Sequence, residues 1–300
     1  MPTKTNVLEP SDFVHLHNHT QYSLLDGMTK VPALLRFIQD SGMKAVAITD
    51  HGTLSGAIEF YEESLKHEVK PIIGIETYIA ARSHTDKDVA YDKQNYHLTV
   101  LAMNNTGYQN LMKLSTIANL EGMYYRPRID HELLEKYNDG LIVLSGCIGS
   151  EVGDSLRQDQ YDKAKEISTW YKSIFGDRYY LELLDHGHKN HPAAWDEQVK
   201  VNEKLIKLSK ELKIPCVVTC DAHYLHPEDK EAHEILLCVQ TGSFVKDKDR
   251  MSLAEFELHV TPAEEIIERW GSEHPDFITN TKQIADRCNV TIDLGNILIP

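Results

Sequence analysis

The 300-residue chain has an ordinary globular composition, with 41% hydrophobic and 26% charged residues, but carries a formal net charge of −15 at pH 7. Because non-specific DNA affinity comes mainly from Lys and Arg at phosphates, this acidity argues against strong DNA binding by the chain alone. No apolar run is long enough to span a membrane and the five cysteines form no CxxC pair, so we expect a cytoplasmic protein without disulfides or structural zinc fingers.

Short apolar or β-branched runs alternate along the chain with longer segments of helical periodicity. Strands are predicted over residues 13–18, 44–50, 71–80, 96–103, 140–147, 179–184 and 214–221. Helices are predicted over residues 31–42, 55–67, 106–122, 160–176 and 193–212, and again over 226–242, 261–271 and 277–293. Alternation of this kind predicts βα units and a parallel sheet, and seven strands favour a barrel over an open sheet.

The stretch FVHLHNHTQYSLLDG, residues 13–27, contains His15, His17 and His19 on alternate positions, followed by Asp26. A strand has a side-chain period of two, so it would send all three imidazoles to the same face. Neutral imidazole is a common metal ligand, and His-x-His on a strand lets two imidazoles converge on one ion. The alternative is a strand whose histidines hydrogen-bond to neighbouring loops.

Further imidazole, carboxylate and thiol groups lie in or beside the later predicted strands. They are Asp50, His51, Glu76, His97, Cys147, Asp221 and His223. The C-terminal ends of barrel strands gather at one mouth, where active sites are built, so we expect these residues to meet there. Taken singly, Cys147 has the alternative of a small buried hydrophobe, and Glu76 that of a satisfied core carboxylate.

The mixture of ligand types bears on the identity and number of the metal ions. Imidazole and thiolate suit zinc, whereas several carboxylates favour manganese or magnesium. One tetrahedral ion takes about four ligands and the candidates number roughly twice that, so we expect more than one ion. Closely spaced ions bridged by a carboxylate such as Glu76 stabilise the attacking and leaving oxygens of phosphate-ester hydrolysis. The predicted reaction is metal-assisted hydrolysis.

Six segments of the chain resemble, in the same order, the motifs of the PHP (polymerase and histidinol phosphatase) domain found at the N-terminus of bacterial DNA polymerase III alpha subunits. They are HLHNHTQYSLLDG, ITDHGTLSG, PIIGIETYIA, YHLTVLA, LSGC and CDAHY. Two further segments, EILLCVQTG and ADRCNVTIDLGNILIP, resemble that subunit rather than a stand-alone histidinol phosphatase. The resemblance covers essentially the whole chain. It implies a distorted (β/α)7 TIM-like barrel with extra C-terminal helices over residues 1–275, and the start of a connection to a polymerase region over 276–300.

The same resemblance implies a trinuclear centre, and the sequence matches the full ligand pattern. Carried over position by position, the ligands are His17, His19, Asp26, His51, Glu76, His97, Cys147, Asp221 and His223. One ion would be held by His17, His19, Glu76 and Asp221, a second by Glu76, His97 and Cys147, and a third by Asp26, His51 and His223. The expected cofactors are two or three divalent ions drawn from Zn, Mn, Fe and Mg, with Asp221, Glu76 and His51 as catalytic residues. His15 and Asp50 are expected to support the ligands.

The resemblance also suggests what such a centre does. In this family a full ligand set accompanies a 3′ to 5′ proofreading exonuclease in the same chain, whereas subunits that have lost ligands serve as a scaffold for a separate proofreading exonuclease subunit. The full set favours an active phosphodiesterase on a DNA 3′ end. The alternatives are a catalytically silent, metal-stabilised scaffold and a small-molecule phosphatase. Because the sequence has no paired-aspartate palm motif, we expect a nucleoid-associated N-terminal region that needs the remainder of the alpha subunit to polymerise DNA.

Two weaker signals concern substrate contacts. The segment EGMYYRPRID offers Tyr124, Arg126 and Arg128, a combination that can stack on a base and pair with a phosphate of single-stranded DNA. The alternative is an ordinary exposed loop. The histidine-rich stretch HGHKNH, residues 186–191, is expected to be a polar loop; the alternative is a strand-end loop near the mouth that touches substrate.

Overall fold

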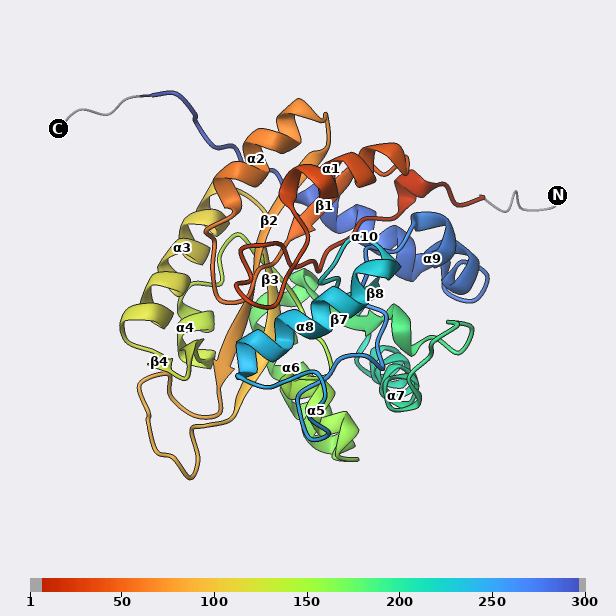
Figure 1. Ribbon diagram of the computed structural model, residues 1–300. Helices are drawn as coiled ribbons and strands as arrows, with labels where there is room; N and C mark the ends of the chain where they lie inside the picture. The colour runs from red at the N-terminus through yellow and green to blue at the C-terminus, as the bar shows by residue number, and fades with distance from the viewer. Residues whose placement is uncertain (1–6, 297–300) are drawn as a thin grey trace.

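The computed structural model describes residues 7–296; residues 1–6 and 297–300, where the predicted domain layout begins and ends, lie outside the described residues. An eight-stranded sheet forms the centre and helices surround it (Figure 1). The strands are β1 Ala45–Ile48, β2 Lys70–Ala80, β3 Asn95–Ala102, β4 Met123–Tyr124, β5 Arg126–Ile129, β6 Leu141–Leu144, β7 Tyr179–Leu184 and β8 Cys216–Thr219. The helices are α1 Val31–Asp40, α2 Ala57–Lys66, α3 Asn105–Leu120, α4 His131–Lys136, α5 Glu151–Arg157, α6 Tyr161–Phe175, α7 Asp196–Leu212, α8 Lys230–Thr241, α9 Ala263–Trp270 and α10 Pro275–Arg287. No helix within residues 7–296 is both long and apolar enough to cross a membrane.

The sheet curls into a barrel that the N-terminal segment closes. Strands follow one another in the order β1, β2, β3, β6, β7 and β8, and β4 and β5 extend the far end of β2. The segment before α1 lies between β1 and β8, because the carbonyl of His15 accepts from the backbone N–H of Ala47 and the N–H of His19 donates to the carbonyl of Ala222. Counting this segment with the six strands gives the seven members of a distorted TIM-like barrel, as the sequence predicted.

The predicted strand over residues 13–18 is not a regular strand. It forms only isolated bridges, at His15 and Asn18, and the Asn18 side chain donates 2.9 Å to a carbonyl of β1 in place of a backbone ladder bond. His15 does not join the other two imidazoles; its Nε2 lies 2.8 Å from the carbonyl oxygen of Thr261. The expectation that all three histidines share one face is therefore wrong, because the segment lacks the regular pleat on which it depended.

Strand β3 runs antiparallel to both of its neighbours, β2 and β6, whereas β1–β2, β6–β7 and β7–β8 pair in parallel. The prediction of a wholly parallel sheet is therefore wrong. Residues 81–94, which join β2 to β3, form a loop without the crossover helix that a parallel connection needs. As a result, the first residues of β3 lie at the end of the barrel where the parallel strands finish, and His97 is brought to that end.

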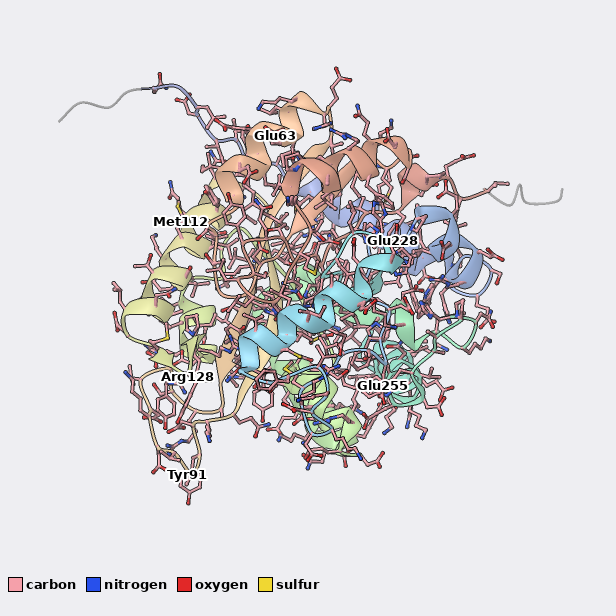
Figure 2. All side chains as sticks on the ribbon, viewed as in Figure 1. Glu63, Tyr91, Met112, Arg128, Glu228 and Glu255 are labelled. Carbon is pink, nitrogen blue, oxygen red and sulfur yellow. The ribbon has the colours of Figure 1, made fainter. Side chains whose placement is uncertain are left out.

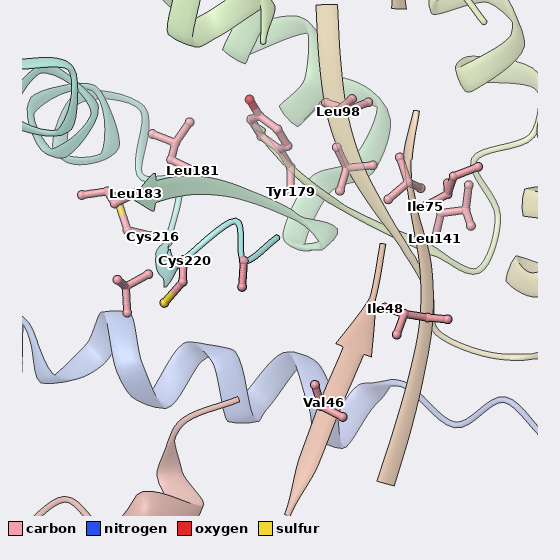
Figure 3. Close-up of a cluster of buried hydrophobic side chains, with 14 of the residues drawn as sticks. Val46, Ile48, Ile75, Leu98, Leu141, Tyr179, Leu181, Leu183, Cys216 and Cys220 are labelled. Carbon is pink, nitrogen blue, oxygen red and sulfur yellow. The ribbon is translucent and has the colours of Figure 1, made fainter. Parts of the chain in front are cut away.

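Alternate residues of the strands build two apolar layers. Val46 and Ile48 of β1 pack with residues such as Ile75 and Leu181 in the larger cluster, part of which is seen in Figure 3. The inward-facing residues between them, such as Ala47, pack in a second cluster near the beginnings of the parallel strands. Each fully buried Val, Ile or Leu side chain contributes roughly 1.5–3 kcal/mol, so these layers hold the strands whose ends carry the polar groups.

Helix α10 covers the base of the barrel, opposite the polar end. Its buried Ile284 and Ala285 join the second cluster together with Tyr180 and Val217, which lie near the beginnings of β7 and β8. The boundary predicted at residue 275 therefore coincides with the start of a helix that packs into the barrel core. The connection to a polymerase region, predicted over 276–300, stays a prediction.

Candidate metal centre

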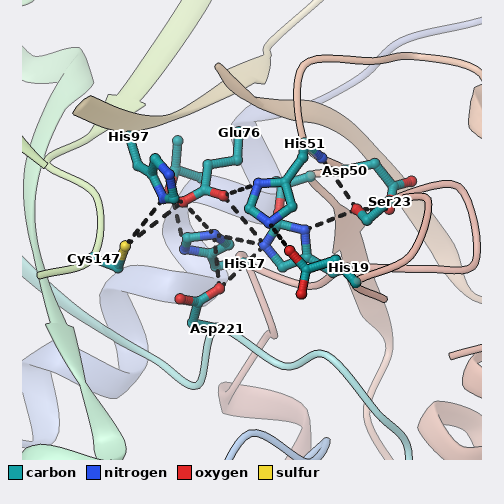
Figure 4. Close-up of polar contacts among 12 residues, drawn as sticks. His17, His19, Ser23, Asp50, His51, Glu76, His97, Cys147 and Asp221 are labelled. Carbon is teal, nitrogen blue, oxygen red and sulfur yellow. Dashed lines mark hydrogen bonds and ion pairs between the residues drawn. The ribbon is translucent and has the colours of Figure 1, made fainter. Parts of the chain in front are cut away.

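All nine residues predicted as ligands lie at one end of the barrel, which we call the mouth. Figure 4 labels all of them except Asp26 and His223. They come from the N-terminal segment (His17, His19), the turn after it (Asp26), the end of β1 (His51), the middle of β2 (Glu76), the start of β3 (His97), the loop after β6 (Cys147) and the loop after β8 (Asp221, His223). The strands of the barrel thus bring together side chains that are far apart in sequence. Their binding of metal stays a prediction.

A tight turn over residues 20–27 returns Asp26 to the histidines. Gly27 is required there, because a Cβ at this position would lie 2.2 Å from the carbonyl oxygen of Thr20. The turn places Oδ2 of Asp26 3.1 Å from Nε2 of His51. A larger residue at position 27 would therefore move Asp26 out of the centre.

Four donor atoms, from His17, His19, Glu76 and Asp221, form a compact group. Nε2 of His17 lies 3.3 Å from Nε2 of His19, and Oδ1 of Asp221 lies 3.2 Å from the first and 3.1 Å from the second. The two oxygens of Glu76 lie 3.3 Å from His17 and 3.4 Å from His19. Ligands about 2.0–2.1 Å from one tetrahedral ion stand about 3.3 Å apart, so the spacing of this group fits such an ion.

A second group extends from Glu76 toward β3 and β6. Oε1 of Glu76 lies 3.0 Å from Nδ1 of His97, and Sγ of Cys147 lies 3.5 Å from that nitrogen and 3.8 Å from Oε1. One oxygen, one nitrogen and one sulfur thus surround a common point. Glu76 belongs to both groups, which is the position expected of a bridging carboxylate.

On the other side of Glu76, the imidazole of His51 links two carboxylates. Its Nδ1 lies 2.6 Å from Oε2 of Glu76 and its Nε2 lies 3.1 Å from Asp26. The ring of His223 stacks on that of His19, with centroids 4.3 Å apart, and donor atoms of His19, His51 and His223 lie within 4.8 Å of one another. His19 is therefore as close to this third group as to the first, and the division of the ligands among ions stays a prediction.

Some buried polar atoms of the centre make no hydrogen bond of acceptable geometry within residues 7–296, although two of them, Nδ1 of His51 and Oε2 of Glu76, lie 2.6 Å apart. They are Oδ1 of Asp26, Nδ1 of His51, Oε2 of Glu76 and Nε2 of His233, which we call the open atoms. An unsatisfied buried polar atom costs about 1–3 kcal/mol. Imidazole and carboxylate lone pairs are satisfied together by a divalent cation, so this donor set fits divalent metal ions.

The charges of the centre depend on its neighbours as well as on burial. Burial opposes ionisation of Glu76, but the surrounding imidazoles, first of all His97, outweigh it and hold the pKa of the carboxyl well below its ordinary value. Burial and the nearby His51 lower the pKa of His19 to about 3, so its imidazole is neutral. Burial raises the pKa of the Cys147 thiol well above its ordinary value, so a thiolate at this position requires a cation beside it.

Glu182 of β7 orients the imidazole of His17. Its Oε1 accepts from Nδ1 of His17 and from Oγ1 of Thr219, each at 2.7 Å, and its Oε2 accepts from Thr99 at 3.1 Å and from the backbone N–H of Gly146 at 3.0 Å. Because a carboxylate surrounded by donors acts only as an acceptor, the proton of His17 is kept on Nδ1. Burial opposes protonation of the ring, but Asp221, Glu182 and Glu76 outweigh it and raise the pKa of His17 well above its ordinary value, so a metal ion would have to displace the proton of Nε2.

Asp50 supports a different histidine from the one beside it in sequence. Oγ of Ser23 donates to Asp50 at 2.7 Å and lies 3.0 Å from Nδ1 of His19. Since the hydroxyl proton is used on Asp50, Ser23 accepts from Nδ1 of His19 and leaves Nε2 of that ring for a ligand. Asp50 was expected to support a ligand. It supports the ring of His19, through Ser23, and not the ring of His51.

Sequence reasoning missed three residues beside the centre: Glu182, His186 and His233. Glu182 is fully buried in the apolar strand YYLELL, and a single charge in such a strand was the signal available for it. His233 projects from α8, and its Nε2 lies 3.7 Å from Oδ1 of Asp26. Nothing in the pattern of α8 distinguishes His233 from an ordinary helical residue.

The loop predicted to contact substrate has an outer and an inner arginine. Arg126 is exposed, and its guanidinium lies over the ring of Tyr78, 5.5 Å from the centroid. Arg128 is fully buried and donates to four backbone carbonyls, so it is not available to a phosphate. Tyr124 packs against the Arg128 guanidinium, 5.2 Å away. The expected substrate contact is therefore corrected for the buried Arg128 and stays a prediction for Arg126 and for the half-buried Tyr124.

The histidine-rich stretch 186–191 is more buried than a polar loop. His186, His188 and His191 are each 5–6% exposed. The stretch begins within a 3₁₀ turn, η3 Asp185–Gly187, directly after β7. This position at the end of a parallel strand carries His186 to the wall of a cavity at the mouth.

Two cavities open on the centre and share Asp26 and His51. The first, of ≈ 200 Å³, lies toward β7 and the segment after α8, and Phe256 forms part of its wall. The second, of ≈ 310 Å³, lies toward β5 and is lined by Tyr78 and Arg126. The ligand cluster therefore stands between an apolar cavity and one with a free cationic side chain.

Comparisons with known proteins agree with this description. The family model of the PHP domain matches residues 15–186. The chain is similar to the DNA polymerase III subunit alpha of Borreliella burgdorferi, with 42% identity over 280 residues, covering 93% of this chain and 24% of that protein. It is similar to the same subunit of Deinococcus radiodurans, with 42% identity over 300 residues, covering 96% of this chain and 22% of that protein. The chain thus spans about a quarter of the length of the curated relatives it matches.

Among solved structures, an amidohydrolase from Chromobacterium violaceum with bound sulfate and no metal is similar at a TM-score of 0.45 and 11% identity, covering 70% of this chain and 87% of that one. The residues matched by the family model include the His-x-His segment, the strands that carry Glu76 and His97, and Cys147. More than half of the chain lies within that match, and the chain belongs to the PHP domain family.

Proposed function

We propose that this chain is the PHP domain of a DNA polymerase III alpha subunit, and that its centre binds two or three divalent ions and hydrolyses the terminal phosphodiester at a DNA 3′ end. The observation that carries this proposal is the convergence of the donor atoms at a place where two cavities meet. Structural metal sites are closed, whereas catalytic sites keep an open position for substrate. The similarity to DNA polymerase III alpha subunits supports DNA as the substrate.

The nine predicted ligands would hold the ions. Once bound, divalent ions neutralise the charge that develops on a phosphate and lower the pKa of a water molecule. The side chains of Asp221 and His51 are 13% exposed while that of Glu76 is 1% exposed, so the first two meet the substrate and Glu76 positions the centre from below. Asp221 and His51 are the proposed catalytic residues, and Glu76, which the sequence predicted to be catalytic, is a proposed positioning ligand.

Arg126 is the proposed phosphate contact. It is exposed at the edge of the second cavity and stacks on Tyr78, which restrains the guanidinium near the mouth. The net charge of −15 makes DNA binding by this chain alone weak, so the remainder of the alpha subunit is the proposed partner that presents the 3′ end.

The direct test is degradation of a primer with a mismatched 3′ end, annealed to its template, in the presence of Mn²⁺ or Zn²⁺. The matched variant is Asp221→Asn, which keeps the size of the side chain and removes its charge. We expect hydrolysis to fall by on the order of 10²–10³-fold, as for loss of one group that stabilises transition-state charge. Circular dichroism and thermal melting establish that both proteins are folded, and equal hydrolysis by the two would contradict the proposal.

A scaffold for a separate proofreading exonuclease subunit is the second candidate function. Helix α8 and the loop after it expose Ile235, Val239, Phe244 and Val245, each at least 49% accessible. Neighbouring apolar side chains of this kind are common where partner proteins bind. If the metal-loaded chain does not cleave DNA even within the whole alpha subunit, the scaffold is the better account.

A further inference from the structure

Helix α8 brings to the metal centre a histidine that is not one of the nine predicted ligands. In Figure 1 the helix lies across the front of the molecule, and four of its residues are buried: His233, Glu234, Leu237 and Cys238. His233 is 1% exposed, so its imidazole has no useful contact with bulk water. What the ring does must therefore be sought among its neighbours inside the protein.

The ring of His233 packs against the loop after β8, which carries two predicted ligands. Its centroid lies 5.6 Å from that of His223 and 5.3 Å from that of Tyr224. Tyr224 is held in turn, because its hydroxyl accepts from the backbone N–H of Leu258 at 3.1 Å. These two rings fix the position of the imidazole, and its Nε2 faces the carboxylate of Asp26.

The distance between His233 and Asp26 does not correspond to a hydrogen bond. Nε2 of His233 lies 3.7 Å from Oδ1 of Asp26, and both are open atoms. A hydrogen bond would join such a nitrogen and oxygen at roughly 2.7–3.2 Å. Two ligands of one tetrahedral ion stand about 3.3 Å apart, a few tenths of an ångström less than the separation here. One divalent ion bound by both atoms would satisfy both.

Asp26 has imidazoles on more than one side, and His233 is as close to it as a predicted ligand is. Oδ2 of Asp26 lies 3.1 Å from Nε2 of His51, and Oδ1 lies 3.9 Å from Nε2 of His223. Nδ1 of His223 lies 2.7 Å from the carbonyl oxygen of Asp221, which can only accept, so Nε2 is the free nitrogen of that ring. His233 thus presents Nε2 to the same carboxylate oxygen as His223 does.

We propose that His233 is a tenth metal ligand of the centre, and that its Nε2 binds the ion predicted at Asp26, His51 and His223. This inference rests on the proposed function, since it concerns a metal-loaded centre. The three predicted residues supply one ligand fewer than the four that a tetrahedral ion takes, and His233 supplies the fourth. Because His233 belongs to a helix outside the barrel strands, the same ion would attach α8 to the mouth.

Attachment of α8 would also fix part of the first cavity. Glu234, the residue after His233, accepts from Oγ of Ser252 at 2.7 Å and from the backbone N–H of Leu253 at 2.8 Å. Helix α8 therefore holds the segment that follows it. That segment contributes Met251 and Leu253 to the wall of the first cavity. An ion bound by His233 would thus order one wall of the space that opens on the centre.

The direct test observes the ring nitrogens of the histidines by ¹⁵N NMR, with and without Zn²⁺. A nitrogen that binds zinc has a chemical shift distinct from that of a protonated nitrogen and from that of a free lone pair. The spectrum of His233→Gln identifies the His233 signals by their absence. In the wild type we expect Nε2 of His233 to move to the metal-bound position when Zn²⁺ is added.

The other outcomes of this experiment separate the two proposals. If the His233 signals stay in place while other histidine rings respond to Zn²⁺, the inference is overturned and the metal centre stands. If no histidine ring responds, the proposed metal centre is rejected and the tenth ligand with it. His233→Phe, which keeps a ring beside His223 and Tyr224, provides the assignment if the glutamine variant does not fold.

Metal affinity distinguishes a ligand from a residue that only positions Asp26. The amide in His233→Gln can still donate a hydrogen bond to Asp26, but zinc prefers an imidazole. We expect competition with a chromophoric chelator to show that one zinc ion binds at least about tenfold more weakly in this variant. His67→Gln, at the end of α2, is the matched control and should keep the wild-type affinity. Equal affinity in His233→Gln and the wild type would contradict the inference.

Amide hydrogen exchange tests the consequence for α8. We expect Zn²⁺ to slow exchange over Lys230–Thr241 in the wild type and to leave it unchanged in His233→Gln. Helix α3, which carries no predicted ligand, is the internal reference and should exchange alike with and without Zn²⁺. Equal slowing of α8 in both proteins would show that another contact orders the helix, and would count against His233 as a ligand.

Discussion

Two regions of this chain bury charged groups, and they satisfy them in opposite ways. The loops at residues 81–94 and 122–130, which we call the arginine loops, enclose Arg128, whose guanidinium donates to four backbone carbonyls. The Asp92 carboxylate in the same loops accepts two hydrogen bonds from Arg82, at 2.9 and 2.6 Å. At the mouth, carboxylates and imidazoles crowd together, yet the open atoms remain. Figure 2 labels Arg128 at the lower left of the view, above Tyr91 of the 81–94 loop.

The difference shows what each region needs in order to be stable. In the arginine loops, opposite charges and carbonyl acceptors balance one another, so protein atoms alone complete the structure. In the centre, imidazoles and carboxylates pair with one another, but several buried polar atoms still make no hydrogen bond, and such atoms are costly. Added cations should therefore stabilise the mouth and have little effect on the arginine loops.

Metal removal should give the largest effect on stability. A chelator such as EDTA removes the metal ions proposed to bind the open atoms. If the free metal concentration before chelation is about a thousand times the dissociation constant, the unfolding free energy then falls by about 4 kcal/mol. For a chain of this size that corresponds to a fall in Tm of roughly 6 °C. Differential scanning calorimetry with excess Mn²⁺ and with EDTA measures it.

The control for metal removal is the variant Glu76→Gln, in which the bridging carboxylate is lost. Because Glu76 belongs to two of the three groups, its variant should show a much smaller difference between the Mn²⁺ and EDTA curves. A wild-type Tm that does not change with EDTA would contradict the view that the centre depends on cations.

Replacing Arg128 by Met should destabilise the protein by roughly 2–3 kcal/mol, because hydrogen bonds from a charged donor are lost and buried carbonyls are left short of donors. Metal content and DNA hydrolysis should be unchanged, since the arginine loops are complete without ions. Urea unfolding measures the change. The matched variant is Arg126→Met, two residues away but exposed, which should leave stability unchanged and raise KM for DNA. The opposite pattern in the two variants would reverse the roles that we assign to these arginines.

These two regions also differ in how far the sequence predicted them. At the mouth, most ligands are polar residues in or directly beside apolar strands, a contrast that is visible in the sequence. In the arginine loops, Arg126 and Arg128 have the same local sequence character, and only the tertiary packing of residues 81–94 decides that Arg128 points inward. A pattern of residue types cannot reveal which of two neighbouring cations finds carbonyl partners.

The fold shows the same limit. Apolar periodicity was sufficient to predict the barrel strands β1 to β3 and β6 to β8 and the long helices, because burial on one face leaves a period in the sequence. Strand direction leaves no such trace, and β3 was expected to be parallel. The pattern over 13–18 predicted a regular strand where the segment makes only isolated bridges, and the short helices α4 and α5 were not predicted.

Changing Glu182 to Gln tests whether residues behind the ligands contribute to the centre. The carboxylate accepts from four donors, and an amide would turn an NH₂ group toward one of them. His17 would lose its fixed orientation, and we expect metal affinity to fall by about 10- to 100-fold. Competition with a chromophoric chelator measures it, and Glu62→Gln on the exposed face of α2 is the matched control. Unchanged metal affinity in Glu182→Gln would mean that His17 keeps its orientation without the Glu182 carboxylate.

The smallest expected effect is a pH dependence in the arginine loops. Asp130 caps α4 by accepting from the backbone N–H of Leu133, and it also accepts from the backbone and ring of His84. Burial opposes its ionisation, but the hydrogen bonds outweigh burial and lower the pKa of Asp130 below the ordinary 3.8. A carboxyl whose pKa is depressed by folding contributes stability that is present above the unfolded pKa and is lost as the pH falls through the folded pKa.

The difference in unfolding free energy between wild type and Asp130→Asn should therefore be constant above pH 5 and shrink below about pH 4, as urea titrations at several pH values can show. A difference that stays constant down to pH 3 would mean that the hydrogen bonds to Asp130 do not favour its charged form, and that the arginine loops are not balanced by charge as we describe.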